Sequence, residues 1–356
     1  MQMAEIRKYR NKVLLSDSSA ELFFQPYAAE KVQNILKTQR CSEVDKMQRL
    51  YIVGNGFDLA HDLPTKYWDY HQFLQSSSKN SDFCRRMENT YGLGENTEYW
   101  WKDFETNLGK GDSFETDFEI MGESAIDEMV TDEGEPMPDV EDTLRYHFEP
   151  YYEFMNKLNE TVLQWIETID VNQAKRIFKR VKAADSYFFT FNYTELLEEV
   201  YKVPEKQICH IHGSISEGTV EIGHGNLESI EKYREEAHEK EKIFDKNGAE
   251  ISKGIYNFYK ASFKDTKKII AANEDIFNGY RGITEVYVYG HSLGEVDMPY
   301  FKEIKRHIVK NAAWYFYVLC KKEELKEKKA ELLKKIECLH IKRQYIHIYT
   351  VDKFLI

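Results

Sequence analysis

Polar side chains suited to splitting a glycosidic bond follow several short apolar runs of this sequence. Gly54 and Gly56 follow one run, and Asn192 and His212 follow two others. Glycines let backbone N–H groups approach an anion, an asparagine amide can orient water, and an imidazole transfers protons near neutral pH. Cleavage of an N-glycosidic bond passes through an oxocarbenium-like state, which Asp58 could stabilise with its negative charge. These residue types predict a hydrolytic or nucleotide-binding site.

The first of these groups lies where a strand is expected to meet a helix. Residues 50–53 form a short apolar run, and a helix-like pattern begins at Asp58. A buried parallel strand followed by a glycine turn and a helix offers backbone N–H groups and a helix dipole to an anion. The third glycine of the full dinucleotide fingerprint is missing, so a tight turn without a ligand is the alternative.

Further strands are expected along the chain, and several end in polar residues. The expected strands are residues 186–191, 208–212, 219–223, 285–289, 314–320 and 345–350. The carboxyl ends of parallel strands meet at one edge of a sheet, where ligands bind in open α/β folds. We therefore predict an α/β protein with a Rossmann-like, mainly parallel sheet. Asn192 and Thr194 also suit a turn and a helix cap, and His210 would share a strand face with His212.

Long helical stretches separate the strands. We predict a peripheral N-terminal arm at residues 1–46 and an α/β domain at 47–356, with helical insertions at about 62–185 and 227–280. Helix-like patterns cover residues 80–91, 98–108 and 143–182, and a Lys-rich helix covers 321–336. Trp101, Phe104 and Leu108 fall on one face of a helix, which predicts core packing. Glu105 beside Trp101 is either an acid–base group or an ion-paired side chain.

The negative charge is concentrated in one segment. Residues 112–142 contain thirteen Asp and Glu and no Lys or Arg, whereas the whole chain has a net charge of −12, so the rest carries about +1. Carboxylates without counter-charges repel one another. We therefore predict an exposed, partly flexible loop here, and no basic face for duplex nucleic acid.

The composition indicates the cellular compartment in which the protein is expected. The five cysteines are scattered and form no CxxC pair, which is typical of reduced thiols in the cytoplasm. The chain has neither an apolar run of membrane-spanning length nor an apolar N-terminal signal. We expect a cytoplasmic protein that does not bind membranes.

The ordered motifs resemble the AbiH family of phage abortive-infection proteins over about residues 47–320. The resemblance is carried by Gly54-Asn55-Gly56-Phe57-Asp58-Leu59-Ala60, Trp101 to Glu105, Asn192-Tyr193-Thr194, His212-Gly213-Ser214, Gly223-His224-Gly225-Asn226 and Gly290-His291-Ser292-Leu293 with Asp297. It implies an antiviral effector with a nucleotide ligand, controlled by a phage-derived trigger or by self-association.

The same motif order is more remotely similar to sirtuin-like domains, which bind NAD and whose defence members hydrolyse it. The similarity implies that Asn192 contacts the nicotinamide ribose and positions water, and that His212 is the base or a ribose contact. NAD contacts are then expected from Gly54, Asn55, Gly56, Phe57, Tyr193, Thr194, Gly213, His224, Gly290, His291 and Ser292. Sirtuins have a small residue where Asn55 stands here, and their zinc-binding cysteine quartet is missing. Neither protein deacetylation nor a metal is therefore expected.

Other functions fit parts of the sequence. Gly290-His291-Ser292-Leu293-Gly294 resembles the nucleophile elbow of α/β-hydrolases, with Ser292 as nucleophile and His340 or His347 as base. His210, His212 and His224 could hold a metal, although no carboxylate or cysteine ligand accompanies them. A module that binds a nucleotide without turning it over is the non-catalytic alternative.

Overall fold

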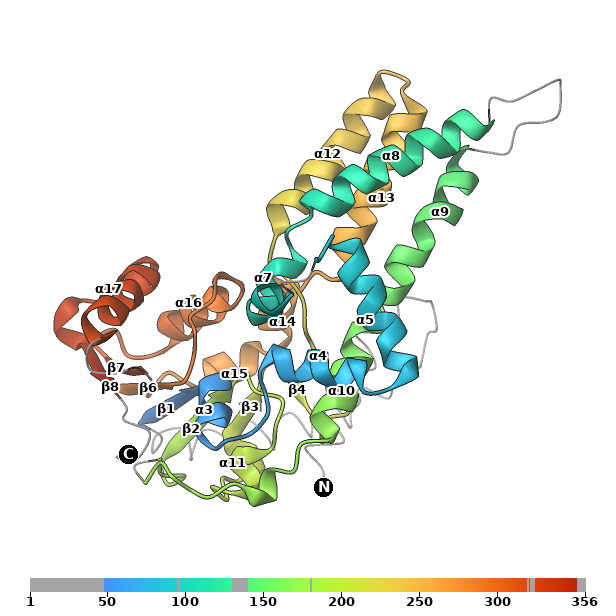
Figure 1. The fold of residues 1–356 in the computed structure, drawn as a ribbon. Helices are drawn as coiled ribbons and strands as arrows, with labels where there is room; N and C mark the ends of the chain where they lie inside the picture. The colour runs from blue at the N-terminus through green and yellow to red at the C-terminus, as the bar shows by residue number, and fades with distance from the viewer. Residues whose placement is uncertain are drawn as a thin grey trace, which may run out of the picture. The chain divides into compact units, whose positions relative to one another are not determined.

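The computed structural model describes residues 48–94, 97–129, 140–179, 181–318, 320 and 324–350 (Figure 1). The predicted arm at residues 1–46 lies outside these ranges. The chain divides into two compact units, which we describe separately. The first contains the described residues up to Pro64, Ile169–Thr219 and the residues from Lys267 onward. The second contains Thr65–Thr168 and Val220–Thr266.

The first unit is built on a six-stranded sheet in the order β3-β2-β1-β6-β7-β8. All neighbouring strands are parallel. The strands are β1 (Arg49–Val53), β2 (Ser186–Thr190), β3 (Ile208–His210), β6 (Glu285–Tyr289), β7 (Ala313–Val318) and β8 (Ile346–Thr350). Counted along the chain, this order is 3-2-1-4-5-6, the order of dinucleotide-binding doubly wound sheets. The predicted Rossmann-like, mainly parallel α/β fold is therefore confirmed.

The strand order reverses between β1 and β6, the central pair of the sheet. Their registers join Arg49 to Glu285 and Val53 to Tyr289, so both strands end at the same level. Ligands of open α/β sheets bind outside the carboxyl ends of strands at such a reversal. The fold thus defines one edge of the first unit at which a site is expected.

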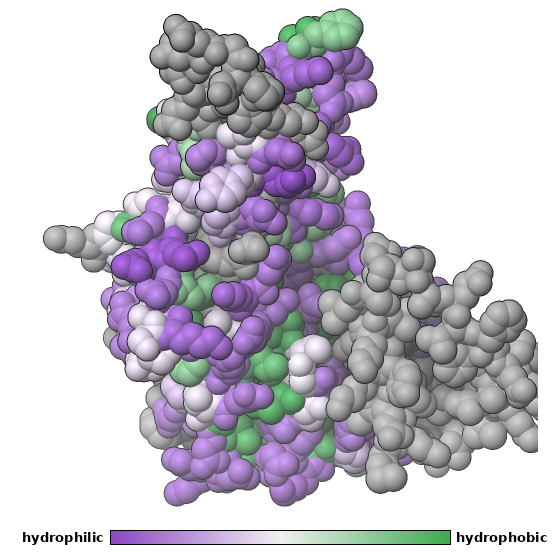
Figure 2. Space-filling view, turned by 90° about the vertical axis from the view of Figure 1, so that its right-hand side faces the viewer, coloured by the Kyte–Doolittle hydropathy of each residue, from purple (hydrophilic) through white to green (hydrophobic). Residues whose placement is uncertain are grey.

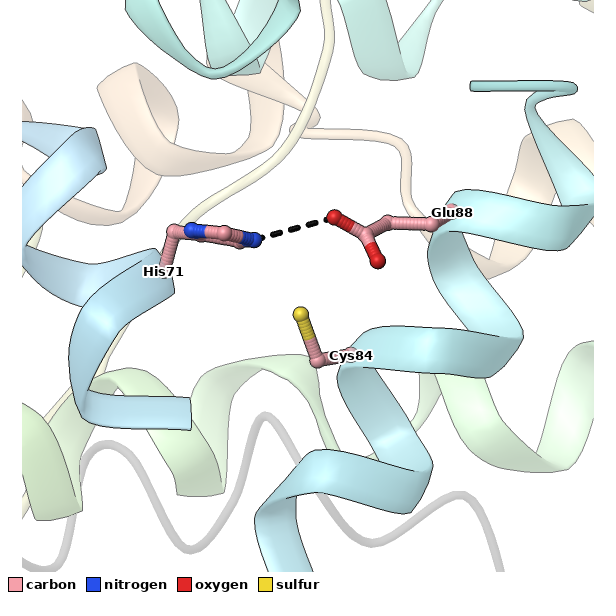
Figure 3. Close-up of side chains that lie close together, drawn as sticks. All are labelled: His71, Cys84 and Glu88. Carbon is pink, nitrogen blue, oxygen red and sulfur yellow. Dashed lines mark hydrogen bonds and ion pairs between the residues drawn. The ribbon is translucent and has the colours of Figure 1, made fainter. Parts of the chain in front are cut away.

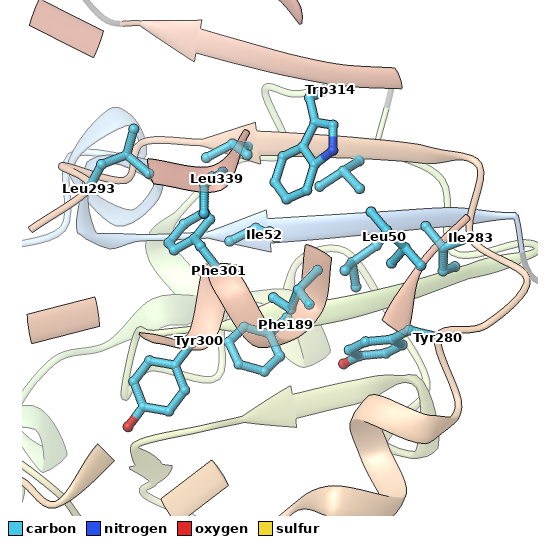
Figure 4. Close-up of a cluster of buried hydrophobic side chains, with 14 of the residues drawn as sticks. Leu50, Ile52, Phe189, Tyr280, Ile283, Leu293, Tyr300, Phe301, Trp314 and Leu339 are labelled. Atoms are coloured by element: carbon cyan, nitrogen blue, oxygen red, sulfur yellow. The ribbon is translucent and has the colours of Figure 1, made fainter. Parts of the chain in front are cut away.

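One face of this sheet carries the main hydrophobic core (Figure 4). Leu50 and Ile52 alternate with Tyr51 along β1, so period-two alternation sends the aliphatic side chains to this face. The core is covered by α15 (Glu274–Asn278), α16 (Met298–His307) and α17 (Leu325–Ile336), which contribute Phe277, Tyr300, Phe301, Ile304, Leu332 and Ile336. Burying each such aliphatic or aromatic side chain contributes roughly 1.5–3 kcal/mol.

Stacked tyrosines line the opposite face of the sheet. Tyr51 stacks on Tyr287 with ring centroids 5.1 Å apart, and Tyr287 stacks on Tyr315 at 4.8 Å. The three residues are register partners on β1, β6 and β7. Cross-strand pairs of this kind stabilise the pairing of neighbouring strands.

The remaining elements of the first unit are short. The helices α3 (Asn55–Ala60) and α11 (Leu196–Glu199) follow β1 and β2, and α14 (Thr266–Ala272) precedes α15. Two short strands, β4 (Gly213–Ser214) and β5 (Thr219–Val220), follow β3, and β5 is shorter than the predicted strand. The strand predicted at 208–212 ends at His210, so strand alternation does not relate His210 to His212.

The second unit is helical. Its helices are α4 (Tyr67–Gln75), α5 (Ser78–Thr90), α6 (Glu98–Lys102), α7 (Phe104–Leu108), α8 (Asp112–Met129), α9 (Val140–Met155), α10 (Leu158–Glu167), α12 (Leu227–Lys242) and α13 (Lys246–Ala261). The predicted helix at 98–108 is two helices that meet at Asp103, whose backbone leaves the helical region. The helical pattern predicted up to residue 182 ends at Glu167, apart from one short turn (Val171–Gln173). Trp101, Phe104 and Leu108 are fully buried, as predicted.

The prediction of a loop at residues 112–142 is wrong for residues 112–129 and for residues 140–142, which begin α9. Residues 112–129 form α8, whose Phe114 and Phe118 lie one turn apart and are buried. Phe118 stacks on Phe148 of α9, and Phe114 packs on Phe258 of α13. The apolar contacts hold the segment in a helix although its charges repel. Residues 130–139 lie outside the described ranges.

One face of the molecule shows mainly polar residues (Figure 2). The face drawn in Figure 2 is mostly hydrophilic, in keeping with a chain of which 31% is charged. Among the described helices, none combines the length and apolar character that crossing a membrane requires.

Candidate functional site

Most of the predicted site residues lie at the carboxyl edge of the first unit's sheet. Asp58 is on α3 directly after β1, Asn192 and Thr194 follow β2, and His210 ends β3. His212 follows β3 by two residues, and His291 follows β6 in the same way. These elements bring together residues that are far apart in the sequence. They form two clusters, one around Asp58 and the other around Asp297.

The Asp58 carboxylate is the centre of the first cluster. Its Oδ1 accepts a hydrogen bond of 2.7 Å from Asn192 Nδ2, and its Oδ2 accepts one of 2.7 Å from Thr194 Oγ1. Asn192 Nδ2 also lies 3.2 Å from the carbonyl oxygen of Gly54. Both N–H groups of the amide thus point toward these two oxygen atoms, and among the described residues the side-chain oxygen of Asn192 has no hydrogen-bond partner, so it can meet a ligand or water. Asp58 is only 2% exposed, so it positions Asn192 from within.

Burial governs the charge of this carboxyl group. Desolvation raises the pKa of Asp58 to about 7, although the hydrogen bonds from Thr194 and Asn192 and the charge of His210 act in the opposite direction. Asp58 therefore changes its protonation state near neutral pH, whereas an ordinary aspartate is fully ionised there. The sequence predicts that Asp58 provides a negative charge near a ribose. Because its carboxyl group titrates near pH 7, Asp58 would provide that charge fully only above this pH.

Replacing Asp58 by asparagine should remove a pH dependence of stability. The folded-state pKa is raised from 3.8 to about 7, so the folded protein holds this proton more tightly than the unfolded chain does. Stability from this group is complete below pH 3.8 and is lost as the pH rises through about 7, a change of roughly 4 kcal/mol at most. The substituted side chain keeps one acceptor for Asn192 and gains a donor for Thr194.

The measurement is urea unfolding of both proteins from pH 4 to pH 8. We expect the free energy of unfolding of wild type to fall relative to that of Asp58→Asn as the pH rises. His210 and Glu198 are present in both proteins, so the difference between the two curves reports Asp58 together with its coupling to these two neighbours. Two parallel curves would contradict the buried, titrating carboxyl group.

His210 completes this cluster from the end of β3. Its Nδ1 lies 3.0 Å from the carbonyl oxygen of Asn192, and its Nε2 lies 2.8 Å from Glu198 Oε1. Both partners are acceptors, so the ring donates from both nitrogens when it is charged. Burial lowers the pKa of His210, but the hydrogen bond and the charge of Glu198 outweigh burial, so the pKa lies above its ordinary value. His210 thereby links Glu198 to the loop that carries Asn192.

The second cluster places two imidazoles on either side of Asp297. His212 Nε2 lies 3.8 Å from Asp297 Oδ1, and His291 Nε2 lies 3.3 Å from Asp297 Oδ2. The backbone N–H of Leu293 donates to His291 Nδ1 at 2.8 Å. In a neutral His291 ring the proton is therefore on Nε2, which faces Asp297. Both imidazole rings are about 3% exposed, whereas Asp297 is 20% exposed.

Aromatic side chains enclose the second cluster. The ring of Phe191, the residue directly after β2, lies 4.3 Å from that of His291 and 5.3 Å from that of His212. Tyr300 packs at 5.4 Å from His212. A carboxylate beside an imidazole in such surroundings stabilises the imidazolium that forms when the ring takes a proton. The arrangement thus suits His212 for general-base chemistry.

The predicted glycine turn packs directly against the loop after β6. The Gly56 N–H donates to the carbonyl oxygen of Gly290 at 2.7 Å, and the Phe57 N–H donates to that of Gly54 at 2.8 Å. A Cβ on Gly56 would lie 2.8 Å from Gly290 Cα, and one on Gly54 would lie 2.7 Å from His291 Cα. The lack of side chains at both positions is required by this approach of two backbones.

Replacing Gly290 by alanine should destabilise the fold. Gly290 has a φ of +61°, and a Cβ there would lie 2.3 Å from the Phe57 nitrogen. The left-handed conformation alone costs about 1–2 kcal/mol for a residue with a Cβ, and the clash adds to this cost. Gly294→Ala is the matched control, since its Cβ would meet only Ser292 Oγ at 3.8 Å. Thermal melts of the two variants check the prediction, and equal melting temperatures would contradict it.

The remaining residues that are predicted to contact NAD differ in how deeply they are buried. Phe57 is buried and stacks on Phe178 with centroids 4.8 Å apart. Tyr193 is buried, whereas Asn55 and Ser292 are exposed. Gly213 has a φ of +82° directly after His212. Phe57 therefore contributes to the core behind the turn.

His224 belongs to the second unit and is bonded on both sides. Its Nε2 lies 2.9 Å from the carbonyl oxygen of Tyr259, and its Nδ1 accepts from the Asn226 N–H at 3.0 Å. Burial lowers the pKa of His224 to about 4, so the ring is neutral at pH 7.

Glu105, also in this unit, accepts a hydrogen bond from Tyr67 and forms an ion pair with the buried Lys264, which agrees with the ion-paired alternative. Within the described residues, His210, His212 and His224 form no group with metal-binding geometry.

The loop at Ser292 differs from a nucleophile elbow. Residues 290–294 are irregular, and a short 3-10 turn (Glu295–Asp297) precedes α16. The positive φ after β6 belongs to Gly290 and Leu293, whereas an elbow strains its nucleophile. His347 stacks on Tyr315 of the sheet. In the described ranges no hydrogen bond joins Ser292 Oγ to a histidine, and the serine hydrolase interpretation has no support from this geometry.

Two acidic residues of the clusters were given no function by sequence reasoning. Asp297 stands in the last of the ordered motifs, but only the loop geometry shows that it lies between His212 and His291. Glu198 follows Asn192 by six residues on α11, where a solvated helix residue would be expected. The sequence signal that could have identified Glu198 was His210 at the end of the next strand, since a histidine there can pair with a carboxylate.

Comparison with known proteins gives one match. The model of the family described as bacteriophage abortive infection AbiH matches residues 50–318, which is more than half of the 356 residues. Searches of curated proteins and of solved structures each find no match. The matched range begins in β1 and ends with β7, so it contains both clusters of the candidate site.

Proposed function

The chain belongs to the bacteriophage abortive infection AbiH family, and we propose on that premise that it acts against phage by binding NAD and hydrolysing it to nicotinamide and ADP-ribose. The proposed site is the carboxyl edge of the first unit's sheet. Depletion of NAD would deprive an infected cell of a cofactor that phage replication also needs.

The observation that carries this proposal is the fixed orientation of Asn192. Asp58 and the Gly54 carbonyl hold its amide nitrogen, and the side-chain oxygen is left at the carboxyl end of β2. The strand order of the sheet is that of dinucleotide-binding folds, and their ligands bind at this edge. A positioned amide oxygen at this edge suits a contact to a ribose hydroxyl or to the attacking water.

The reaction can be written with these side chains. The bond between C1′ of the ribose and the nicotinamide nitrogen breaks, and its electron pair leaves with nicotinamide. Water held by Asn192 adds to C1′ of the oxocarbenium-like ribose, and His212 accepts the proton that the water loses. Asp297, 3.8 Å from His212, stabilises the resulting imidazolium.

The glycine turn has a smaller part in this proposal than the sequence predicts. The N–H groups of Gly56 and Phe57 already donate to backbone carbonyls, so they are engaged before any pyrophosphate arrives. The proposal therefore depends on Asn192 and His212. In it, Asp58 is a positioning residue.

The test is incubation of the full chain with a panel of nucleotides, followed by chromatographic separation of the products. Release of nicotinamide and ADP-ribose from NAD supports the proposal. Binding of a nucleotide without turnover would instead favour a sensing module. Ester cleavage that is lost in Ser292→Ala would favour a serine hydrolase.

A further inference from the structure

Three side chains with metal-binding atoms converge in the helical unit, apart from the residues of the proposed NAD site. They are His71 on α4 and Cys84 and Glu88 on α5. Figure 3 shows the Cys84 sulfur pointing toward the gap between the imidazole of His71 and the carboxylate of Glu88. The donor atoms of the three residues all lie within 4.8 Å of one another.

The local sequence accounts for this convergence. Cys84 and Glu88 are four residues apart on α5, so they lie on the same face of the helix, one turn apart. His71 is in the middle of α4, the helix that precedes α5 in the chain. Its ring packs between Trp68, with centroids 4.5 Å apart, and Trp101, at 4.9 Å. These aromatic rings fix the imidazole so that its Nε2 faces α5.

Without a bound cation, two neighbouring side chains compete for the Nε2 atom of His71. His71 Nε2 lies 2.9 Å from Glu88 Oε1 and 3.2 Å from the Gln75 amide nitrogen. A single ring nitrogen either donates to the carboxylate or accepts from the amide, and it cannot do both. A cation at this position would take the Nε2 lone pair and the Glu88 oxygen together.

Two of the three donors are shielded from water, and one of them carries a proton. His71 is 3% exposed and Cys84 is 1% exposed, so both ligand atoms are shielded from bulk water. Burial raises the pKa of the Cys84 thiol to about 12, with the nearby charge of Glu88 acting in the same direction. The thiol therefore keeps its proton near neutral pH while no cation is bound, and a divalent cation that binds here would displace that proton and balance the charges of the thiolate and the Glu88 carboxylate.

We propose that His71, Cys84 and Glu88 bind a zinc-type divalent cation, with water as the fourth ligand. One nitrogen, one sulfur and one oxygen donor form a set that suits Zn²⁺, a borderline-soft ion that accepts all three. Zn–ligand bonds of about 2.0–2.3 Å place tetrahedral donors about 3.5 Å apart, so small side-chain movements would bring the present donors to that spacing.

The bound cation would join α4 to α5. Because its ligands come from two helices, binding would favour the folded state of this unit. Sequence spacing alone does not predict this site, since the residues form no CxxC pair and the histidine precedes Cys84 by thirteen residues. The site is independent of the proposed NAD chemistry, which uses other residues.

Titration of the full chain with Co²⁺, a spectroscopic substitute for Zn²⁺, tests the proposal. We expect one equivalent of Co²⁺ to produce a thiolate-to-cobalt charge-transfer band in wild type, and Zn²⁺ to abolish it. Cys84→Ser should lose the band, whereas Cys209→Ser, which alters another buried thiol, should keep it. His71→Gln and Glu88→Gln should weaken binding by more than the roughly 10–100-fold that an outer-shell change costs.

Thermal melts with and without Zn²⁺ provide a second readout. The melting temperature should rise with Zn²⁺ in wild type and in Cys209→Ser, and stay unchanged in Glu88→Gln. Wild type without a charge-transfer band would overturn the proposal, as would an equal band in folded Cys84→Ser. Circular dichroism establishes that each variant is folded.

Discussion

The His212→Gln variant should hydrolyse NAD about 10²–10⁴-fold more slowly than wild type, the usual contribution of a general base. Glutamine is similar in size to histidine and can form hydrogen bonds, but it cannot accept a proton from water. The Asp297 carboxylate would then have no imidazolium to stabilise at position 212. Initial rates at saturating NAD measure the effect.

The pH profile separates a base from a residue that only supports the fold. The wild-type rate should fall on the acid side as the imidazole takes up a proton, since only the neutral ring can act as a base. The residual rate of His212→Gln should lose the part of this dependence that comes from the imidazole and keep the part that comes from Asp58, whose pKa is raised to about 7. His307→Gln, which alters a histidine that pairs with Glu303 on α16, is the control and should keep the wild-type rate. Equal rates for His212→Gln and His307→Gln would contradict the proposed base.

Asn192→Ala should lower the rate of NAD hydrolysis by about 10²–10³-fold, as is typical when a positioned polar group is removed from a catalytic site. The substitution also removes one of the two side-chain donors to Asp58, so a buried carboxylate loses a partner. That loss should cost about 1–3 kcal/mol of stability. A change in activity must therefore be compared with a variant of similar stability.

Tyr201→Phe supplies this comparison. Its hydroxyl lies 2.8 Å from His61 Nε2 and accepts from the Phe178 N–H at 3.0 Å, so its removal also leaves buried groups unpaired in the same unit. We expect similar falls in melting temperature for the two variants, with loss of turnover only in Asn192→Ala. Full activity in a folded Asn192→Ala protein would show that Asn192 is merely a turn residue.

The strands could be anticipated because burial leaves a clear pattern. Leu50 and Ile52 alternate with a tyrosine, and the apolar run stops at Gly54. These few residues therefore predict a strand, the level at which it ends and the turn that follows it. The helix at residues 112–129 was missed because thirteen carboxylates in its neighbourhood obscured the spacing of Phe114 and Phe118. Two buried aromatic residues one turn apart outweigh the repulsion of exposed charges.

The candidate site was only partly predictable, because its contacts depend on the order of the strands in space. Gly56 meets Gly290 only because β1 lies beside β6, although 234 residues separate them in the sequence. The partnership of His210 with Glu198 likewise depends on how α11 packs beside β3. His224 follows a motif of the same kind as His212, but it lies in the other unit and both its nitrogens bond to the main chain.

NAD hydrolysis at the Asn192–His212 edge is tested most directly by product analysis of wild type beside Asn192→Ala and Tyr201→Phe. The full chains are incubated with NAD, the products are separated by chromatography, and binding is followed by calorimetry. We predict that nicotinamide and ADP-ribose appear in equal amounts with wild type and Tyr201→Phe, and that Asn192→Ala binds NAD but releases nicotinamide about 10²–10³-fold more slowly. Intact NAD with wild type and no heat of binding would contradict the proposal.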